Sequence, residues 1–364
     1  MQVIGIKRAL NALRKVVPAR HHNLLLAYVR LSVGNGGLRL FGTDEVADVE
    51  LSIPAETEKE ADFLVPGEVL FDLPASAGEE PVALEVGEDH LYWRVGNFKA
   101  EIRVAPVGGY PEPLFPPDGQ EVFISREVLA KAVARVRHAV AKDSYRGVLR
   151  GILMEFTDTS LRLVATDGYR LALYDLPQAA PFQEKVVVPA EGLTKALQVL
   201  EATEAEEIAI RLAPGVVGLN ASGQALSARV GLRLLGGAFP EYGGVIPKDF
   251  VAQVLVETQV LREALRRLEV LADEDNRRLD FSLGEGSLRI AVKGTQAEAE
   301  EEVPAQVGGG ALLPEFSLNA RYLLEALPDE DGETLIRLSG KTTPLLVSPA
   351  GKGDYRAVLV PLRT

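Results

Sequence analysis

The stretch SREVLAKAVARVRHAV (residues 125–140), followed by GILMEFTDTSLRLVATDG (residues 151–168), decides the fold. The first segment repeats apolar residues with the 3.6-residue period of an amphipathic helix, and Ser125 is a residue type that caps helix N-termini. The second segment alternates apolar and polar residues on both sides of a turn, as a β-hairpin does. A helix followed by antiparallel strands indicates an α+β unit.

The same pattern occurs on both sides of this stretch. GIKRALNALRKVV (5–17) precedes the hairpin pattern LLLAYVRLSVGNGGLRLFGT (24–43), with Asn35-Gly36 as its turn. TQVLREALRRLEVL (258–271), with Thr258 as the expected N-cap, precedes RLDFSLGEGSLRIAVKGT (278–295). The three helix patterns begin at residues 5, 125 and 258. A pattern that recurs at nearly constant spacing is the signature of a repeated structural unit.

Each unit also contains a second helix pattern that follows a strand and precedes further alternating strands. These helix patterns lie within residues 63–76, 186–201 and 316–329. Pro- and Gly-rich segments at 107–120 and 236–250 separate the units. We predict three α+β domains of one design, each with two helices packed on antiparallel sheets, at residues 1–119, 120–250 and 251–364.

The composition of the 364 residues is that of an ordinary globular chain, with 47% hydrophobic and 25% charged residues. The absence of cysteine excludes disulfides, thiolate metal sites and cysteine nucleophiles. Charges recur throughout the first residues, unlike in a signal peptide, and no apolar run reaches membrane-spanning length. We therefore expect a cytoplasmic protein without a membrane partner.

The net charge of −13 conceals an uneven distribution. Seven basic residues and no acidic residue precede Asp44, and residues 126–150 contain seven basic and two acidic residues. The rest of the chain has 25 basic and 50 acidic residues. These two basic windows are either solvated helix faces or a surface for nucleic acid.

Three further signatures carry a resemblance. They are ATDGYRLA (165–172), FPEYGGVIP (239–247) and the C-terminal YRAVLVPLR (355–363). In this order on a threefold repeat, they resemble the DNA clamp family of bacterial DNA polymerase III beta subunits. The resemblance implies a head-to-tail homodimeric ring with helices around a central hole, which encircles duplex DNA and confers processivity. It implies no cofactor and no enzymatic activity.

The resemblance implies that the basic helices face the DNA. Binding to duplex DNA without sequence specificity needs positive charge near the phosphates and no base-reading motif. We expect these residues to face duplex DNA without sequence specificity: Arg8, Arg14, Lys15, Arg20, Lys131, Arg135, Lys142, Arg262, Arg266 and Arg267. Glu263 and Glu269 dilute the charge of the last three. For each residue alone, an ordinary solvated position is the alternative. The Arg20-His21-His22 sequence departs from the family's usual Gly- and Pro-rich loop.

The resemblance also implies a hydrophobic cleft for short peptides of the replicative polymerase, the clamp loader and repair proteins. The expected lining is Leu149, Thr166, Gly168, Tyr169, Arg170, Leu171, Pro240, Val245, Asn319, Tyr322, Val358, Val360, Pro361, Leu362 and Arg363. The alternatives are a plain turn closed by Asp167, a linker and a terminal strand. Val360 and Leu362 replace the family's frequent methionines and Gly244 a frequent basic residue, so a stiffer pocket with narrower peptide preference is expected.

The ring contact falls, by position, on an edge strand with Ala100, Ile102 and Val104, and on Val270 and Leu271. For the last two, ordinary helix core is the alternative.

The rival class, an enzyme, lacks its motifs. The four histidines, His21, His22, His90 and His138, show no metal-ligand spacing, although a chance surface site at His21-His22 stays open. The glycine runs lack nucleotide-binding spacing, no nucleophile elbow occurs, and the acidic runs are typical of solvated faces. We therefore expect no catalytic and no metal-binding residues. A peptide-binding scaffold of the same repeat that does not bind DNA is the remaining alternative.

Overall fold

The computed structural model describes residues 2–3, 5–34, 36–57, 59–74, 81–143, 145–309, 315–328, 332–351 and 353–363. The chain divides into two compact units. The first comprises Met1–Lys131, Thr157–Thr159 and Gln178–Leu235, and the second comprises Ala132–Phe156, Ser160–Pro177 and Gly236–Thr364. Within the described ranges, no helix is both long and apolar enough to cross a membrane.

One order of elements occurs three times along the chain: a strand, a helix, four strands, a second helix and three strands. The helices are α1 (Ile6–Leu13), α2 (Gly67–Asp72), α3 (Arg126–Val136), α4 (Ala190–Leu200), α5 (Thr258–Glu269) and α6 (Ala320–Ala326). Short 3-10 helices are η1 (Leu24–Ala27), η2 (Arg137–Ala139), η3 (Gly147–Arg150), η4 (Glu201–Thr203) and η5 (Gly243–Val245). The predicted α+β repeat is confirmed, whereas the exact domain boundaries stay predictions.

The first unit is built on an eight-stranded antiparallel sheet. Its spatial order is β5 (Ala61–Pro66), β2 (Tyr28–Gly34), β3 (Gly37–Thr43), β4 (Ala47–Pro54), β16 (Ser227–Arg233), β15 (Val216–Ser222), β14 (Glu207–Ala213) and β9 (Glu121–Ser125). At the centre, Val49 of β4 pairs with Val230 of β16, so strands from the first and second repeats share one sheet. Asn35 of the predicted β2–β3 turn lies outside the described residues.

A smaller sheet and one further strand complete the strands of the first unit. The sheet has the order β1 (Gln2–Val3), β6 (Val82–Val86), β7 (His90–Val95) and β8 (Phe98–Arg103), and β13 (Glu184–Pro189) leads into α4. Trp93 on β7 is fully buried, and its indole N–H donates to Pro74 O over 2.8 Å. Among the described strands, β8 is the last strand in this order and therefore a sheet edge. It contains Ala100 and the buried Ile102, whereas Val104 follows its end, and the ring contact of these three residues stays a prediction.

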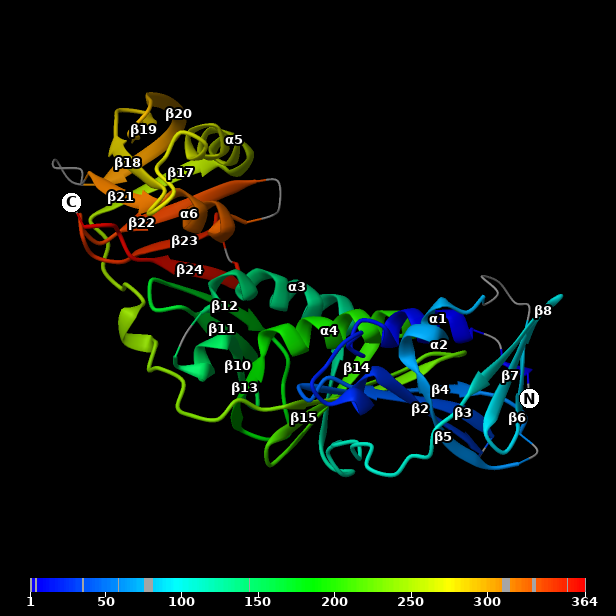
Figure 1. The fold of residues 1–364 in the computed structure, drawn as a ribbon. Coiled ribbons are helices and arrows are strands. Elements are labelled where there is room, and N and C mark those ends of the chain that lie inside the picture. The colour runs from blue at the N-terminus through cyan, green and yellow to red at the C-terminus, as the bar shows by residue number, and fades with distance from the viewer. Residues whose placement is uncertain are drawn as a thin grey trace. The chain divides into compact units, whose positions relative to one another are not determined.

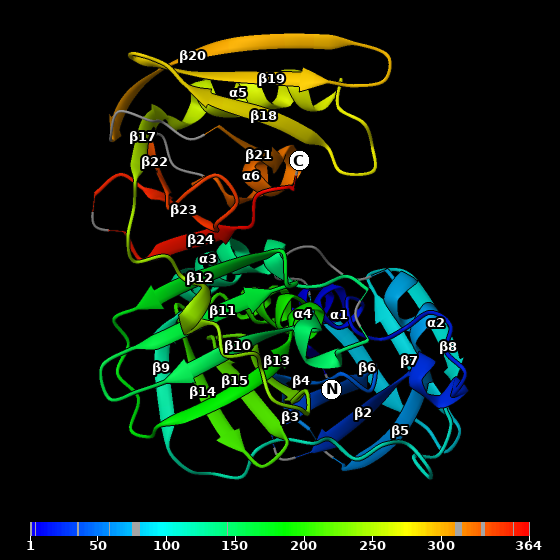
Figure 2. The same cartoon turned by 90° about the vertical axis from the view of Figure 1, so that its left-hand side faces the viewer.

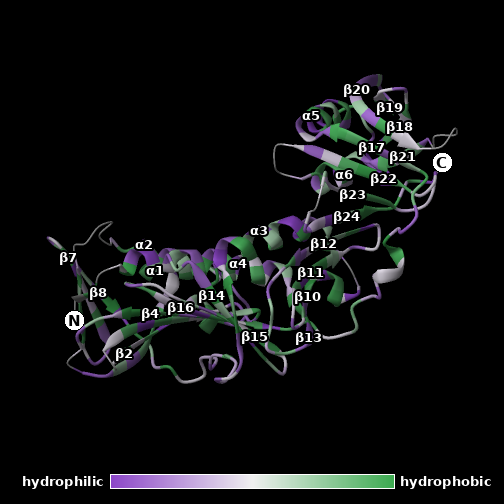
Figure 3. Ribbon diagram, turned by 180° about the vertical axis from the view of Figure 1, so that it is seen from behind, coloured by the Kyte–Doolittle hydropathy of each residue, from purple (hydrophilic) through white to green (hydrophobic). Residues whose placement is uncertain are grey.

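Helices α1 and α4 lie side by side on one face of the eight-stranded sheet (Figure 1). Both helices are amphipathic, and Figure 3 shows hydrophobic and hydrophilic residues alternating along them. Gly42 of β3 permits the close approach of α1 to the sheet, because a Cβ there would lie 3.2 Å from Leu13 Cδ1 of α1 and 2.4 Å from Cγ2 of Val17, which follows the helix. The apolar faces of α1 and α4 are thus covered, and their polar faces are left to solvent.

The second unit contains a continuous antiparallel run of strands. Its order is β10 (Gly151–Phe156), β11 (Leu161–Thr166), β12 (Arg170–Leu176), β24 (Tyr355–Leu359), β23 (Leu345–Pro349), β22 (Glu333–Leu338), β17 (Ala252–Glu257), β20 (Glu298–Gly309), β19 (Ser287–Lys293), β18 (Arg278–Leu283) and β21 (Phe316–Asn319). Figure 2 shows the C-terminal strand β24 beside β12. Leu171 pairs with Val358 in this register, so two of the sequence signatures meet.

The helix starts differ from the predictions in one case. Ser125 caps α3, since its Oγ accepts the N–H of Val128 over 3.4 Å. Thr258 is not a cap: it is the first residue of α5, and its hydroxyl lies 2.8 Å from that of Thr334 in the buried core. A buried hydroxyl must find a partner, and Thr334 is that partner.

Candidate functional site

A groove of about 230 Å³ lies in the second unit where β12, β24 and the 236–250 segment meet. Ten of the residues predicted for the peptide cleft line it: Leu149, Thr166, Gly168, Tyr169, Arg170, Leu171, Pro240, Val245, Val358 and Val360. Four further lining residues were not predicted: Arg146, Glu241, Tyr242 and Pro344. Residues from three distant parts of the sequence therefore form one site.

The groove has an apolar floor and an exposed apolar rim. Leu149, Leu171 and Val358 are buried in the floor, whereas Tyr169 and Val245 are 66% and 49% exposed at the rim. A concave apolar surface with exposed aromatic and aliphatic groups is the usual form of a site that anchors side chains of a peptide.

The turn after β11 shapes one wall of this groove. Thr166 Oγ1 donates to Arg170 O over 2.7 Å and accepts the N–H of Gly168. Asp167 Oδ1 accepts the N–H groups of Tyr169 and Arg170 over 2.9 and 3.0 Å. Gly168 has a φ of 93°, a conformation that favours glycine. The turn closed by Asp167 is thus present, and it holds Tyr169 at the rim of the groove.

Arg170 fastens this wall to α6. Its buried guanidinium donates to Asp167 Oδ2 over 3.0 Å, contacts Glu325 Oε2 at 2.5 Å and lies 4.1 Å from the ring centroid of Tyr322. Burial alone would raise the pKa of Glu325, but hydrogen bonds from Arg170 and Arg321 hold it below its ordinary value. Arg170 and Glu325 therefore form an ion pair, and this pair holds the wall of the groove in place.

The opposite wall is fixed by Tyr242, which the sequence did not single out. Its hydroxyl donates to Glu155 on β10 and lies 3.5 Å from Arg162 Nη1 on β11. Burial, and then the neighbouring Glu155, raises the pKa of Tyr242, so the phenol stays protonated at neutral pH. These bonds attach the irregular 236–250 segment to the sheet, which places Pro240 and Val245 over the groove.

The remaining residues that were predicted for the cleft lie beside the groove and not in its lining. Asn319 caps α6 by accepting the N–H of Tyr322, and the ring of Tyr322 lies against the guanidinium of Arg170. Past β24, Leu362 donates its N–H to Ser317 O over 2.8 Å. Pro361 is buried and Arg363 is exposed along this C-terminal segment, which thus runs next to β21.

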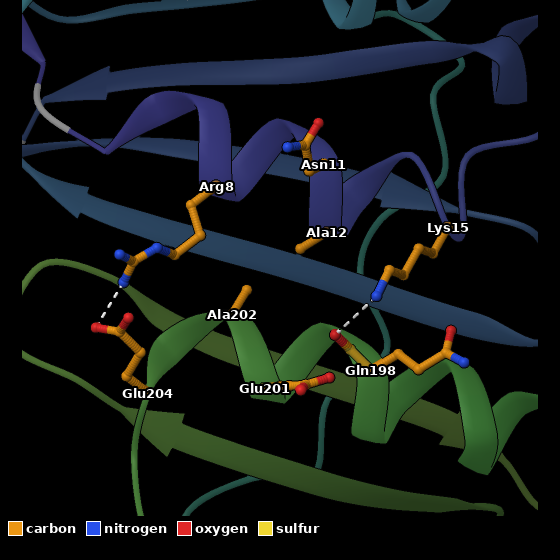
Figure 4. A pocket seen from close by; sticks show the side chains of 8 residues that line it. All are labelled: Arg8, Asn11, Ala12, Lys15, Gln198, Glu201, Ala202 and Glu204. Atoms are coloured by element: carbon orange, nitrogen blue, oxygen red, sulfur yellow. Dashed lines mark hydrogen bonds and ion pairs between the residues drawn. The ribbon is translucent and has the colours of Figure 1, made fainter. Parts of the chain in front are cut away.

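A second concave surface, in the first unit, contains the cations predicted on α1. Figure 4 shows Arg8 of α1, and Lys15 just after this helix, facing Gln198 of α4, Glu201 of η4 and Glu204, which follows η4. The hollow between them has a volume of about 290 Å³. Arg8 Nη1 lies 2.7 Å from Glu204 Oε2, and Lys15 Nζ donates to Gln198 O over 3.3 Å. All of these charges are in reach of solvent, so they are screened and weakly paired.

Most of the other predicted DNA-facing residues are exposed, and several of them are ion-paired. Arg14 pairs with Asp72 at 3.1 Å, and Arg267 contacts Glu301 at 2.5 Å. Arg262 is half-buried, with a hydrogen bond to Pro328 O. The exposed members are Arg14, Arg20, Lys131, Lys142, Arg266 and Arg267.

The prediction is wrong for Arg135. Its side chain is only 7% exposed, Nη1 donates to Leu327 O over 3.4 Å, and the guanidinium lies 5.5 Å from the ring centroid of Tyr355. Arg135 therefore stabilises the packing of the second unit and does not face solvent.

Val270 and Leu271 follow the end of α5. Their side chains are 82% and 37% exposed, so the alternative of helix core is contradicted for Val270 and weak for Leu271. Exposed aliphatic side chains of this kind suit a contact with another molecule.

No catalytic constellation is evident among the described histidines and carboxylates. Burial lowers the pKa of His138 to about 4, and its Nε2 lies 3.0 Å from the Tyr355 hydroxyl. A neutral, packed imidazole is poorly suited to acid–base chemistry at neutral pH. His21, His22 and Glu45 converge at a separate place in the first unit.

The threefold α+β repeat, with its apolar groove and cationic helices, defines a protein of the DNA clamp class. Family models of the DNA polymerase III beta subunit match residues 3–114 with its N-terminal domain, 123–241 with its central domain and 244–363 with its C-terminal domain. The chain therefore belongs to the family of DNA polymerase III beta subunits, the beta sliding clamps.

Individual relatives are similar to this chain over nearly its full length. The beta sliding clamp of Pseudomonas aeruginosa is 30% identical, with 99% of this chain and 98% of the relative covered. A crystal structure of the DNA polymerase III subunit beta from the same species superimposes with a TM-score of 0.90 at 27% identity, covering both chains completely. Another structure, of the sliding clamp from this species bound to griselimycin, has a TM-score of 0.88 at 27% identity and covers 100% of this chain and 98% of that one.

Proposed function

We propose that two copies of this chain form a ring that encircles duplex DNA and tethers the replicative polymerase and other clients through short peptides. The observation that carries this proposal is the apolar groove, which three separate sequence signatures form together in a chain of the clamp family. Processivity follows physically, because a tethered polymerase rebinds the primer end at high effective concentration after each release.

The DNA contact in this proposal is electrostatic. Exposed cations such as Lys15, Arg20 and Lys131 contact phosphates without reading bases, and they release condensed counterions when they do so. Glu201 and Glu204 lie beside Arg8 and Lys15 and weaken the local positive potential (Figure 4). The contact is therefore weak and falls with salt, which suits a protein that has to slide.

The groove receives the client peptide. Its floor is apolar and its rim carries Tyr169, so Leu and Phe side chains of an extended or partly helical peptide fit the floor and a Gln side chain can bond to the polar edge. The ion pair between Arg170 and Glu325 holds one wall in place before the peptide arrives, which lowers the ordering cost of binding.

In the proposed function, the protein acts without catalysis, in the cytoplasm, where the chromosome is replicated. The family match favours this function over a scaffold that does not bind DNA. The test is primer extension by the cognate polymerase and clamp loader on a primed circle. We expect products of many kilobases with this chain and products at least about 10-fold shorter when Arg14, Arg20 and Lys131 are all changed to Ala, because each removes a phosphate contact. Unchanged product length would contradict the DNA-facing assignment.

The ring contact leads to a prediction of its own. In a head-to-tail dimer, Val270 and Leu271 of one copy meet the β8 edge of the other, and the contact closes after two copies. Changing Val270 to Asp places an unpaired carboxylate in each of two identical contacts, so we expect a monomer in sedimentation velocity at micromolar concentration. The matched control is Val251→Asp, since Val251 is also exposed, at 52%, but lies outside the predicted contact. A V270D chain that stays dimeric would show that the contact lies elsewhere.

A further inference from the structure

We propose that His21, His22 and Glu45 bind one divalent transition-metal ion of the zinc class. In the described part of the chain, these three residues each offer a ligand atom, and all three atoms lie within 4.8 Å of one another. Two imidazoles and one carboxylate are a donor set that suits Zn²⁺, Co²⁺ or Ni²⁺, whereas Mg²⁺ and Ca²⁺ prefer oxygen ligands alone.

The three residues converge through the fold and not only through sequence adjacency. His21 and His22 lie in the loop between α1 and η1, and their ring centroids are 4.0 Å apart. Glu45 lies in the turn between β3 and β4. His22 and Glu45 are exposed and His21 is half-buried, so an ion can enter from solvent.

The backbone of Glu45 is held in an unusual conformation. Its φ is 69°, in the left-handed region that side chains other than glycine rarely adopt. Its N–H donates to Thr43 Oγ1 over 3.0 Å, and its carbonyl oxygen accepts a hydrogen bond from Arg233 Nη1 over 2.9 Å. Such strain persists only where surrounding contacts enforce it and is frequent at binding sites. These bonds hold the turn that presents the Glu45 carboxylate to the two histidines.

The neighbouring groups define how many positions the protein supplies. Asp44 is not a fourth ligand, because Oδ2 bonds Lys195 Nζ at 2.9 Å and Oδ1 accepts the N–H groups of Val46 and Ala47. Among the residues that the structure describes, the site therefore offers three protein ligands, and water completes the tetrahedral coordination of the ion.

One existing hydrogen bond limits the affinity. His21 Nδ1 accepts the N–H of Asn23 over 3.2 Å, and an imidazole nitrogen cannot accept this bond and coordinate an ion at once. Coordination through Nε2 instead requires the proton on Nδ1, which also ends this bond. We therefore expect a dissociation constant on the order of 1–100 μM, weaker than that of a preformed structural zinc site.

The test is calorimetric titration of the untagged full chain with zinc chloride alone, and with cobalt chloride read by its visible absorption. We expect one ion per chain and at least about a 10-fold weaker affinity for both His22→Ala and Glu45→Gln, because each removes a ligand. These two side chains are exposed, so thermal melts of the metal-free variants should match the parent chain.

The matched control is His90→Ala. His90 also lies beside carboxylates, with Nδ1 2.6 Å from Asp89 and 3.8 Å from Glu101, but this group does not form a three-ligand cluster among the described residues. Its loss should leave the affinity unchanged. The proposal is overturned if no ion binds below millimolar concentration, or if either His22→Ala or Glu45→Gln binds zinc as the parent chain does.

Discussion

Changing Leu171 to Glu is expected to abolish the binding of client peptides. Leu171 is 3% exposed and pairs with Val358 across β12 and β24, so its side chain forms part of the groove floor. The introduced carboxylate lies on the apolar floor, and the guanidinium of the adjacent Arg170 is already bonded to Asp167 and Glu325. A carboxylate buried without a partner when the peptide covers the groove costs about 3–5 kcal/mol, which corresponds to a loss of affinity of at least about 100-fold.

The measurement is fluorescence anisotropy of a labelled peptide that contains Gln, Leu and Phe. Because a charge at a buried position can also disturb folding, Val360→Glu serves as a second variant: Val360 is 42% exposed at the groove rim. Leu24→Glu is the matched control, since Leu24 is 76% exposed in the first unit and far along the chain from all groove residues. Sedimentation should show the same dimer for all three variants. Parental affinity of both groove variants would refute this peptide site.

Much of the groove could be predicted from the sequence, because its walls are local motifs. The turn at Asp167 is determined by the hydrogen bonds that its Oδ1 accepts from the N–H groups of Tyr169 and Arg170, and such bonds depend on sequence neighbours alone. The β12–β24 pairing joins two strands that are far apart in the sequence, and only the resemblance to the clamp family placed both signatures at one cleft. The groove residues that lie inside these motifs could therefore be predicted from the sequence.

The missed groove residues depend on contacts between segments that are far apart in the sequence. Tyr242 lies inside a recognised signature, but its role comes from Glu155 and Arg162, some 80 to 90 positions earlier. Pro344 lies in the segment before β23 and carries no local signal of its own. No pattern within one segment shows which polar side chain another segment will offer.

Arg135 shows the corresponding error for charge. A count of basic residues on a helix treats each as solvated, yet Arg135 follows the buried Ala132 and Val133, at the margin of the apolar face of α3. Its guanidinium is covered by Leu327 and Tyr355, about 190 and 220 residues further on. A long side chain can place its aliphatic stem on an apolar surface, so the tertiary structure decides whether its charged end is exposed or buried.

The end of α5 separates two neighbouring apolar residues. The helical period of α5, continued past Glu269, would place Leu271 in the core, three residues after the buried Leu268, but Val270 on the exposed side of Arg266 and Arg267; the helix ends at Glu269. The ends of helices are the least certain part of such a pattern. The exposure of Val270 therefore agrees with the helical period, whereas the partial exposure of Leu271 follows from the termination of α5, which the apolar pattern alone does not show.

Loaded on closed circular DNA, this protein is expected to remain bound far longer than on the same DNA cut once. Non-specific contact by surface cations has dissociation constants of roughly 10⁻⁴–10⁻⁶ M, and steered association proceeds at about 10⁸ M⁻¹s⁻¹, so electrostatic contact alone lasts on the order of milliseconds. The carboxylates beside Arg8 and Lys15 do not lengthen this lifetime. A closed ring on a circle leaves only when an interface opens, and that step does not depend on the phosphate contacts.

The experiment loads labelled protein with a clamp loader onto a nicked plasmid and follows the retained fraction by gel filtration before and after one restriction cut. We expect the half-life on the circle to exceed that on the linear form by at least about 100-fold, since sliding off an end needs no interface to open. Linear DNA with a protein block at both ends is the control and should restore retention. Raising the salt from 50 to 200 mM should weaken phosphate contacts by about 10³–10⁵-fold for a protein with 6–10 such contacts, yet leave retention on the circle far less affected. If salt removes the protein equally fast from circular and linear DNA, the attachment is electrostatic and the ring model is wrong.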